Sequence, residues 1–362
     1  MNITPPVPHR DPSLVPFVRL RDPKTYVACP LDLREDEEAR DYWVKFFKHH
    51  IITIGNLGIG VATARGESQA SAEARAESLR VEFYDVFDAF LRSPASYECR
   101  VTILVLDGWR DDLLRKHGFI DPFQDLKDNE NAGVIDLLPR VCRGLDALEG
   151  PEQIRAIIEG VFAGNIFDMG AAGSAQLLLE GKLDFFHTRK KLPARPWLID
   201  SLDAFTTKAL AHSWKKCVFF VDNAGADFLL GAVPMMRWLG QLGTRIVLAC
   251  NERPTLNDMT FADVTRWWPR VLEKEPSIAG LPIEIVSTGT GEPLIDLLSV
   301  SPALNSAAAD ADLVVLEGMG RGVESNLMAE FDCDAINLAM IKDFIIAKRL
   351  GGKLYDVICR FR

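Results

Sequence analysis

Hydrophobic residues follow two different spacings along the chain. Before about residue 200 they recur every three or four positions, and this spacing is typical of a helix with one buried face. Within residues 67–92 the series is Leu79, Phe83, Val86, Phe87 and Phe90. After Lys215 they form short continuous runs, at Cys217–Val221, Arg245–Cys250, Ile283–Ser287 and Leu313–Leu316. Short apolar runs that alternate with helical segments predict βαβ units and a parallel sheet. Between the first two runs, residues 228–242 form an amphipathic segment.

The first part of the chain is predicted to be mostly helical. Residues 36–50 carry acids at their start and lysine and histidines at their end, which suits the two ends of a helix. Residues 93–119 are ambiguous, because Val101–Leu106 could form a strand, but the positions of Trp109 and the leucines after it favour a helix over most of the segment. Residues 1–30 are rich in proline and predict an extended arm laid over the surface.

Composition and charge narrow the class of protein. The chain has 362 residues, 48% of them hydrophobic and 25% charged, which is ordinary for a globular protein. Its net charge of −10 disfavours a general nucleic-acid binder, because a phosphate backbone requires a basic surface. The sequence has no apolar run long enough for a membrane span and no signal-peptide stretch, and its seven scattered cysteines include no CxxC pair. We therefore expect a cytoplasmic protein with reduced thiols.

Polar residues follow each of the four apolar runs, in the strings DNAGAD, NERPTLND, TGTGEP and EGMGRG. In open parallel sheets ligands bind beyond the carboxyl ends of the strands, where all four strings would lie. Asp222 and Asn223 follow the first run, and Asp258 closes the loop after the second. Two carboxylates and an amide oxygen make a hard, partly open site for Mg²⁺ or Mn²⁺, with waters and a phosphate completing the coordination. The alternative is that these residues only cap helices or form turns.

The string EGMGRG, residues 317–322, could bind an anion. Its glycines let backbone N–H groups approach a phosphate, and Arg321 could pair with that phosphate or with Glu317. The string lacks the full GxGxxG pattern of a dinucleotide site, and a tight turn with an exposed arginine is the alternative. Lys342 lies in a predicted apolar helix, residues 337–352, from which it could snorkel to solvent or reach a phosphate in the site.

The segment GNIFDMGA places Asn165 and Asp168 three residues apart, on one face of a helical turn. The two residues could contact the metal ligands without binding the ion themselves, or they could only start and cap a helix. Other enzyme motifs are missing from the sequence. Trp109 stands where an aspartyl-phosphate hydrolase needs its second acid, and neither a P-loop nor a GxSxG nucleophile string is present.

Four strings together resemble the metal-dependent damage-control phosphatases, namely VDNAGAD, NERPTLNDMT, GNIFDMG and EGMGRGVESN. The string EGMGR resembles the signature of subfamily II, which includes stand-alone plant proteins and the C-terminal domain of the type 4 pantothenate kinases. The resemblance runs from about residue 35 to the end, and without a kinase domain the chain looks like the stand-alone form. It also supports the helical interpretation of residues 101–109.

The resemblance implies an α/β fold, with a C-terminal α/β/α sandwich around a mainly parallel sheet and an N-terminal helical domain before it. We accordingly expect a proline-rich arm at residues 1–35, a helical domain at 36–200 and a metal-binding phosphatase domain at 201–362. The CxxC found near the start of some other branches is missing, so no role is transferred to Cys29.

The resemblance also implies a divalent ion, Mn²⁺, Mg²⁺, Ni²⁺ or Co²⁺, held by Asp222, Asn223 and Asp258. It implies small phosphorylated metabolites as substrates, either sugar phosphates or 4′-phosphopantetheine and its oxidised forms, and hence a damage-control role. The expected substrate-binding residues are Asn165, Asp168, Asn251, Glu252, Arg253, Gly318, Gly320 and Arg321.

The resulting hypothesis is a metal-dependent phosphatase whose catalytic residues are Asp222, Asp258, Lys342 and Glu317. The nucleophile is either water activated by the metal or one of the acids, with Asp258 the first choice of base and Glu317 the second. The rival hypotheses are a methyltransferase that uses S-adenosylmethionine and a metabolite-binding protein without catalysis. The sequence does not indicate the oligomeric state.

Overall fold

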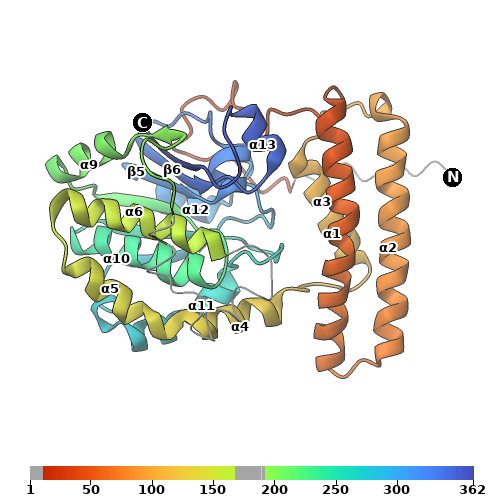
Figure 1. The fold of residues 1–362 in the computed structure, drawn as a ribbon, viewed down its shortest axis with the longest axis horizontal. Helices are drawn as coiled ribbons and strands as arrows, with labels where there is room; N and C mark the ends of the chain where they lie inside the picture. The colour runs from red at the N-terminus through yellow and green to blue at the C-terminus, as the bar shows by residue number, and fades with distance from the viewer. Residues whose placement is uncertain (1–10, 168–188, 190–191) are drawn as a thin grey trace.

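The computed structural model describes residues 11–167, 189 and 192–362. Figure 1 shows two parts side by side: a group of long helices from the start of the chain, and a β-sheet with helices packed on it. Within the described residues, no helix is long and apolar enough to cross a membrane.

The helical part contains α1 (Glu37–Ala64), α2 (Gln69–Arg92) and α3 (Ile103–Lys116). The Asp36 side chain accepts a hydrogen bond from the first turn of α1, which fixes where that helix begins. The facing apolar stripes of the helices, including the stacked rings of Phe83 and Phe87, form one core. The helical interpretation of residues 101–109 is confirmed from Ile103 onward, and α1 extends well beyond its predicted end.

The sheet contains β1 (Ile199–Asp200), β2 (Lys216–Phe220), β3 (Arg245–Cys250), β4 (Ile283–Ser287), β5 (Leu313–Glu317), β6 (Asp334–Met340) and β7 (Val357–Phe361). These strands lie in the order β1-β7-β6-β5-β2-β3-β4, and neighbours run parallel except β6 with β7. The strand order reverses at β2, which lies between β3 and β5, and such a point is the usual ligand site of an open α/β sheet. The predicted α/β fold with a mainly parallel sheet is confirmed.

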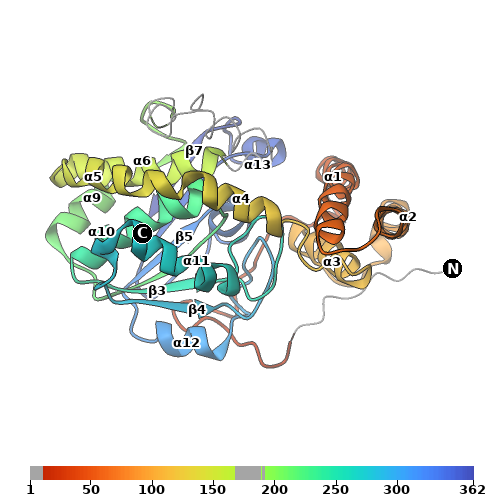
Figure 2. The same ribbon diagram turned by 90° about the horizontal axis from the view of Figure 1, so that it is seen from below.

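Both faces of the sheet are covered. One face carries α4 (Gln124–Val134), α5 (Leu138–Asp146), α6 (Gly150–Phe167), α9 (Leu202–Ala211), α10 (Val233–Gln241) and α11 (Phe261–Lys274), as Figure 2 shows. The other carries α12 (Pro302–Ala308), and α13 (Phe344–Arg349) follows β6. Alternate residues of β2 enter the two cores: Cys217 and Phe219 pack under the first group of helices, and Val218 and Phe220 pack on the opposite face.

Two predicted elements differ from the structure. Residues 337–340 belong to β6 rather than to a helix, and only residues 344–349 beyond them are helical. Because β6 is buried on both faces, its apolar run has no alternation that would separate a strand from a buried helix. The segment predicted to be amphipathic begins as a π-helix, Asp227–Ala232, continues as α10, and is buried almost all round.

Residues 11–30 form an extended arm across the face of the sheet opposite α6. A short β-bridge joins Val15 to Val300, and the buried ring of Phe17 lies 5.6 Å from that of Phe220. The arm is therefore part of a hydrophobic core. Helices α4 to α6 share another core with the sheet, and the division of the chain into arm, helical domain and phosphatase domain stays a prediction.

Candidate metal and phosphate site

Loops from β2 and β3 bring the predicted metal ligands together at the carboxyl edge of the sheet. Asp222 and Asn223 follow β2, and Asp258 lies in the loop between β3 and α11. Asn223 and Asp258 form an isolated antiparallel bridge, and the Met259 amide donates to the Asp222 carbonyl oxygen at 2.9 Å. The three side chains are buried. Backbone pairing therefore holds the two loops side by side, and the side chains of both loops share one buried space.

The Arg321 guanidinium joins the two acids. Its Nη1 donates to Asp222 Oδ1, and its Nη2 donates to Asp258 Oδ2 at 2.5 Å. Nη1 also donates to the Pro293 carbonyl oxygen at 3.2 Å. Burial opposes the charge of Arg321, but Asp258 and Asp222 outweigh burial and raise the pKa of the arginine. The residue is only 1% exposed, so the interpretation as a turn with an exposed arginine is wrong.

Asn223 is held between two carboxylates. Its Nδ2 donates to Asp222 Oδ2 at 2.7 Å and to Asp227 Oδ2 at 3.1 Å. Asn165, on α6, donates to the same Asp227 oxygen at 2.9 Å. Asn165 therefore contacts Asn223 indirectly, through Asp227, a residue that no sequence pattern singled out. Asp168, the residue predicted to act with Asn165, lies outside the described residues.

The loop after β5 passes close to Asp222 because it begins with a glycine. Gly318 has a φ of +89°, and a Cβ atom there would lie 2.0 Å from Asp222 Oδ2. A Cβ atom on Gly320 would lie 2.7 Å from the Pro293 carbonyl oxygen. Gly318 and Gly320 thus allow the loop after β5 to lie close to its neighbours. Any larger residue at Gly318 would displace the Asp222 carboxylate.

Glu317, the last residue of β5, is fully buried beside these groups. Within the part of the chain that the structure describes, neither of its carboxylate oxygens has a hydrogen-bond partner of acceptable geometry. Burial, followed by the charges of Asp227 and Asp222, raises the pKa of Glu317 well above its usual range, although the Asp222 backbone and Arg321 act in the opposite direction. The predicted alternative of a pair between Arg321 and Glu317 is wrong, because the arginine pairs with Asp222 and Asp258.

Three predicted substrate-binding residues begin the loop after β3. Asn251 is buried, and its Nδ2 donates to Asp258 Oδ2 at 3.0 Å. Glu252 and Arg253 are exposed, and the Glu252 carboxylate accepts a hydrogen bond from the Ser287 hydroxyl. Asn251 therefore helps to orient Asp258, whereas Glu252 and Arg253 lie at the surface of the same loop.

Lys342 follows β6, the strand next to β5. Its backbone amide donates to Met319 Sδ, in the loop after β5, at 3.2 Å. The residue is half-buried. Its predicted setting inside a helix was wrong, but the structure places it at the same edge of the sheet as the acids.

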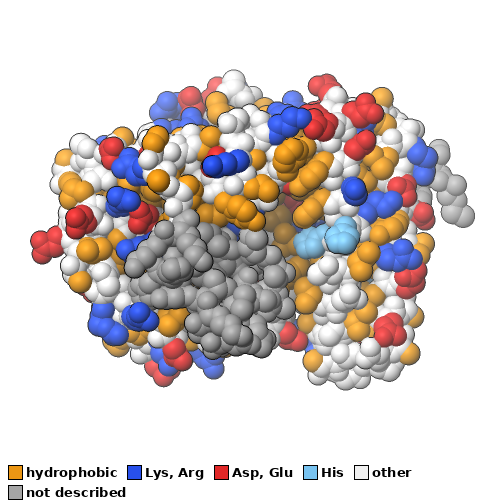
Figure 3. Space-filling view, viewed as in Figure 1, with side chains coloured by type: hydrophobic (Ala, Val, Ile, Leu, Met, Phe, Trp, Pro, Cys, Tyr) orange, Lys and Arg blue, Asp and Glu red, His pale blue; other side chains and the backbone are white. Residues whose placement is uncertain are grey.

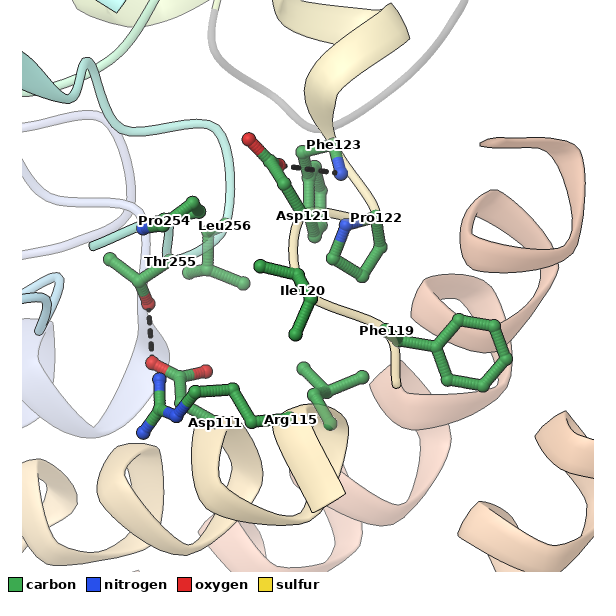
Figure 4. A pocket seen from close by; sticks show the side chains of 11 residues that line it. Asp111, Arg115, Phe119, Ile120, Asp121, Pro122, Phe123, Pro254, Thr255 and Leu256 are labelled. Atoms are coloured by element: carbon green, nitrogen blue, oxygen red, sulfur yellow. Dashed lines mark hydrogen bonds between the residues drawn. The ribbon is translucent and has the colours of Figure 1, made fainter. Parts of the chain in front are cut away.

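Helix α3 holds the loop that carries Asp258. Arg110 Nη2 donates to Thr255 Oγ1 at 2.8 Å, and Thr255 Oγ1 donates to Asp111 Oδ2 at 2.8 Å (Figure 4). The Asp258 amide donates in turn to the Thr255 carbonyl oxygen at 3.2 Å. Arg110 also pairs with Asp107, whose pKa is raised by burial to about 7. The helical part thus reaches the site through Thr255, a contact that no local sequence pattern indicates.

The pocket beside this contact is small. It lies between α3, residues 119–123 and residues 254–256 (Figure 4), and its volume of about 10 Å³ suits one water molecule rather than a metabolite. It is therefore a packing gap at the joint between the two parts. On the surface a hollow separates the helical part from the sheet part, with hydrophobic side chains along it and histidine side chains on its helical side (Figure 3).

Comparisons with known proteins place the chain in a family. Residues 71–358 match the model of the damage-control phosphatase ARMT1-like domain. The chain is 36% identical over 367 residues to the Arabidopsis thaliana damage-control phosphatase At2g17340, covering 97% of this chain and 98% of that protein. It is 30% identical over 402 residues to the Mus musculus 4′-phosphopantetheine phosphatase, covering 96% of this chain and 48% of that protein. A crystal structure of a DUF89 family protein from Pyrococcus horikoshii has a TM-score of 0.62 at 16% identity, over 87% of this chain and 96% of that chain.

Fold and comparisons together define the class of protein. A mainly parallel α/β sheet with polar groups converging at its carboxyl edge is typical of an enzyme that binds a small metabolite. Because the family model matches most of the chain, the chain belongs to the damage-control phosphatase ARMT1-like family. The predicted family, fold and phosphatase activity are confirmed, and neither the methyltransferase nor the non-catalytic alternative is favoured.

Proposed function

We propose that the chain hydrolyses phosphate monoesters of small metabolites with a divalent ion bound by Asp222, Asn223 and Asp258. The observation that carries this proposal is the convergence of Asp222 and Asp258 on one guanidinium group. Both carboxylates therefore face one buried point at which a positive charge is held. The convergence lies where the strand order reverses at β2, the position at which open α/β sheets bind their ligands.

The side chains present fit a small, hard cation. Carboxylate and amide oxygens are ligands that Mg²⁺ and Mn²⁺ prefer, and such sites keep positions open for water and a substrate phosphate. No group of three or more histidine, cysteine, aspartate or glutamate side chains in the described ranges could hold a metal ion. The third proposed donor is the amide oxygen of Asn223, and two carboxylates with an amide oxygen do not suit structural zinc. Oxygen donors discriminate little among Mn²⁺, Mg²⁺, Ni²⁺ and Co²⁺, so all four ions are candidates.

The surrounding residues supply the contacts that phosphoryl transfer requires. When bound, the ion would polarise the phosphate and offset the charge that develops during the reaction. Arg321, Lys342 and the backbone amide of Gly320 would hold the remaining phosphate oxygens. These groups come from the loops after β5 and β6, next to the loop that carries Asp222. The Gly318 amide, predicted to bind substrate, instead donates to the Leu338 carbonyl oxygen at 2.9 Å.

Asp258 is the proposed base for the attacking water. Its Oδ2 accepts hydrogen bonds from Arg321 and Asn251, which orient the carboxylate. Glu317 is less suited, because its raised pKa favours the protonated carboxyl, which cannot accept a proton. As the water oxygen bonds to phosphorus and its proton passes to Asp258, the bond between phosphorus and the metabolite oxygen breaks. The proton on Asp258 then passes to the leaving oxygen, and the products are the alcohol and inorganic phosphate.

The substrate that we propose is 4′-phosphopantetheine or one of its oxidised forms. The support is the similarity to the mouse 4′-phosphopantetheine phosphatase, of which this chain spans about half. All seven cysteines are free thiols, which supports a reducing compartment and the predicted cytoplasmic location.

Phosphatase assays on chelated protein test the proposal. The chelated protein should be inactive and should regain activity with Mn²⁺, Mg²⁺, Ni²⁺ or Co²⁺, and it should hydrolyse 4′-phosphopantetheine and its oxidised forms faster than sugar phosphates. Asp222→Asn keeps the side-chain shape, removes the charge and should abolish metal-dependent turnover. Asp136→Asn is the matched control, because Asp136 is an exposed acid that pairs with Lys274 at the surface. Full activity in the chelated protein, or in Asp222→Asn, would contradict the proposal.

A further inference from the structure

Arg321 lies at the centre of the proposed metal site. Its guanidinium nitrogens bind one oxygen of Asp222 and one oxygen of Asp258, the two acids proposed as metal ligands. The Arg321 side chain is 1% exposed, so solvent screens these contacts little. A buried arginine between two buried carboxylates acts as their internal counter-ion.

The backbone that carries Arg321 is fixed, whereas its side chain is long and has several rotatable bonds. The Asn326 side-chain amide donates to the Arg321 carbonyl oxygen at 3.0 Å, and the Gly322 amide donates to the Gly318 carbonyl oxygen at 2.8 Å. Residues 320–325 form a π-helix, an element that is frequent at functional sites. The guanidinium can therefore change partners while the loop stays in place.

We propose that Arg321 and the divalent ion compete for Asp222 and Asp258, and that the displaced guanidinium then binds the substrate phosphate. This inference rests on the metal site proposed above. Two cations at the same buried carboxylate oxygens repel each other strongly, because the protein interior screens charge less than water does. A guanidinium matches the oxygens of a phosphate as well as those of a carboxylate, through two parallel N–H donors.

The competition determines both the affinity for the ion and the order of binding. In the wild-type protein the ion has to replace an ion pair, which weakens its apparent affinity. The phosphate gains the Arg321 contact only after the ion has taken the carboxylates, so phosphate binding depends on the ion. Before the ion binds, the positive charge of Arg321 offsets the repulsion between the carboxylates of Asp222 and Asp258, so it also stabilises the folded chain.

Calorimetric titration of Mn²⁺ into the chelated full chain, without substrate, tests the competition. Arg321→Gln removes the charge, and it should bind Mn²⁺ about tenfold more tightly than wild type and melt at a lower temperature before Mn²⁺ is added. Arg321→Lys keeps the charge and should bind Mn²⁺ with nearly wild-type affinity. Arg237→Gln is the matched control, because Arg237 is a buried arginine of α10 that pairs with Asp146 of α5. It should melt at a lower temperature with an unchanged Mn²⁺ affinity.

Titrations of inorganic phosphate into wild-type protein and into Arg321→Gln test the transfer of the guanidinium. Phosphate should bind about tenfold more tightly with saturating Mn²⁺ than without it, and Arg321→Gln should lose most of this gain. If Arg321→Gln binds Mn²⁺ no more tightly than wild type does, the inference is overturned while the metal site stands. The same holds if the affinity of wild type for phosphate is unchanged by Mn²⁺. A wild-type protein that binds no Mn²⁺ at all would overturn the metal site and the inference together.

Discussion

Replacing Gly318 with alanine perturbs the proposed site without removing any charged group. Gly318 has a φ of +89°, a conformation that costs an alanine roughly 1–2 kcal/mol. The new Cβ atom would lie 2.0 Å from Asp222 Oδ2, whereas Cβ contacts in proteins stay above 3.0 Å. The Asp222 carboxylate would therefore have to move by roughly the 1 Å difference, and a misplacement of that size lowers kcat about 100-fold.

Gly243→Ala is the matched control for this experiment. Gly243 has a φ of +90°, but nothing lies within 4 Å of an added Cβ atom. The backbone conformation should cost both variants roughly 1–2 kcal/mol in urea unfolding, and Gly318→Ala should lose more because of its clash with Asp222. Only Gly318→Ala should also lose about 100-fold in kcat for metal-dependent hydrolysis. A kcat for Gly318→Ala close to that of Gly243→Ala would refute the reasoning, because the reaction would then not depend on the position of Asp222.

Other substitutions test the contacts around the site. Thr255→Val removes the hydroxyl that joins α3 to the Asp258 loop. It should cost about 1–3 kcal/mol of stability and lower kcat. An unchanged kcat would show that the loop is oriented without this contact. Lys127→Met leaves Asp263 buried without its lysine and should cost about 3–5 kcal/mol at pH 7 in urea unfolding. Burial alone would raise the pKa of Asp263, but Lys127, with Thr260 and Arg266, lowers it to about 2, so wild type should lose stability as the pH falls from about 4 to 2. Equal acid sensitivity of the variant would contradict a leading role for Lys127. Phe17→Ala should lower the free energy of unfolding by about 3–5 kcal/mol, and a negligible change would show that the arm is not part of the core.

The sheet and the acids at its edge could be predicted because their signals are local. The apolar runs at 217–221 and 313–316 are strands buried on both faces, and Asp222 follows the first of them at once. β6 could not be predicted in the same way, because its apolar residues lead within a few positions into a true helix at 344–349. Periodicity does not separate a short buried strand from a buried helix.

The partners inside the site depend on which loops meet, and no local pattern contains that information. Arg321 is 99 residues from Asp222 and 63 from Asp258 along the chain, so its pairing with both acids was not among the expected alternatives. Asp227 and Thr255 were missed for the same reason, since they act through contacts with α6 and α3. The three metal ligands stay a prediction that rests on residue type, position in the sheet and family.

Anomalous X-ray diffraction from crystals containing Mn²⁺ tests the central claim most directly. The account predicts a manganese peak in contact with side-chain oxygens of Asp222, Asn223 and Asp258, with the Arg321 guanidinium turned away from both carboxylates. A manganese peak at a different place in the fold, or no peak at a concentration that restores activity, would contradict it.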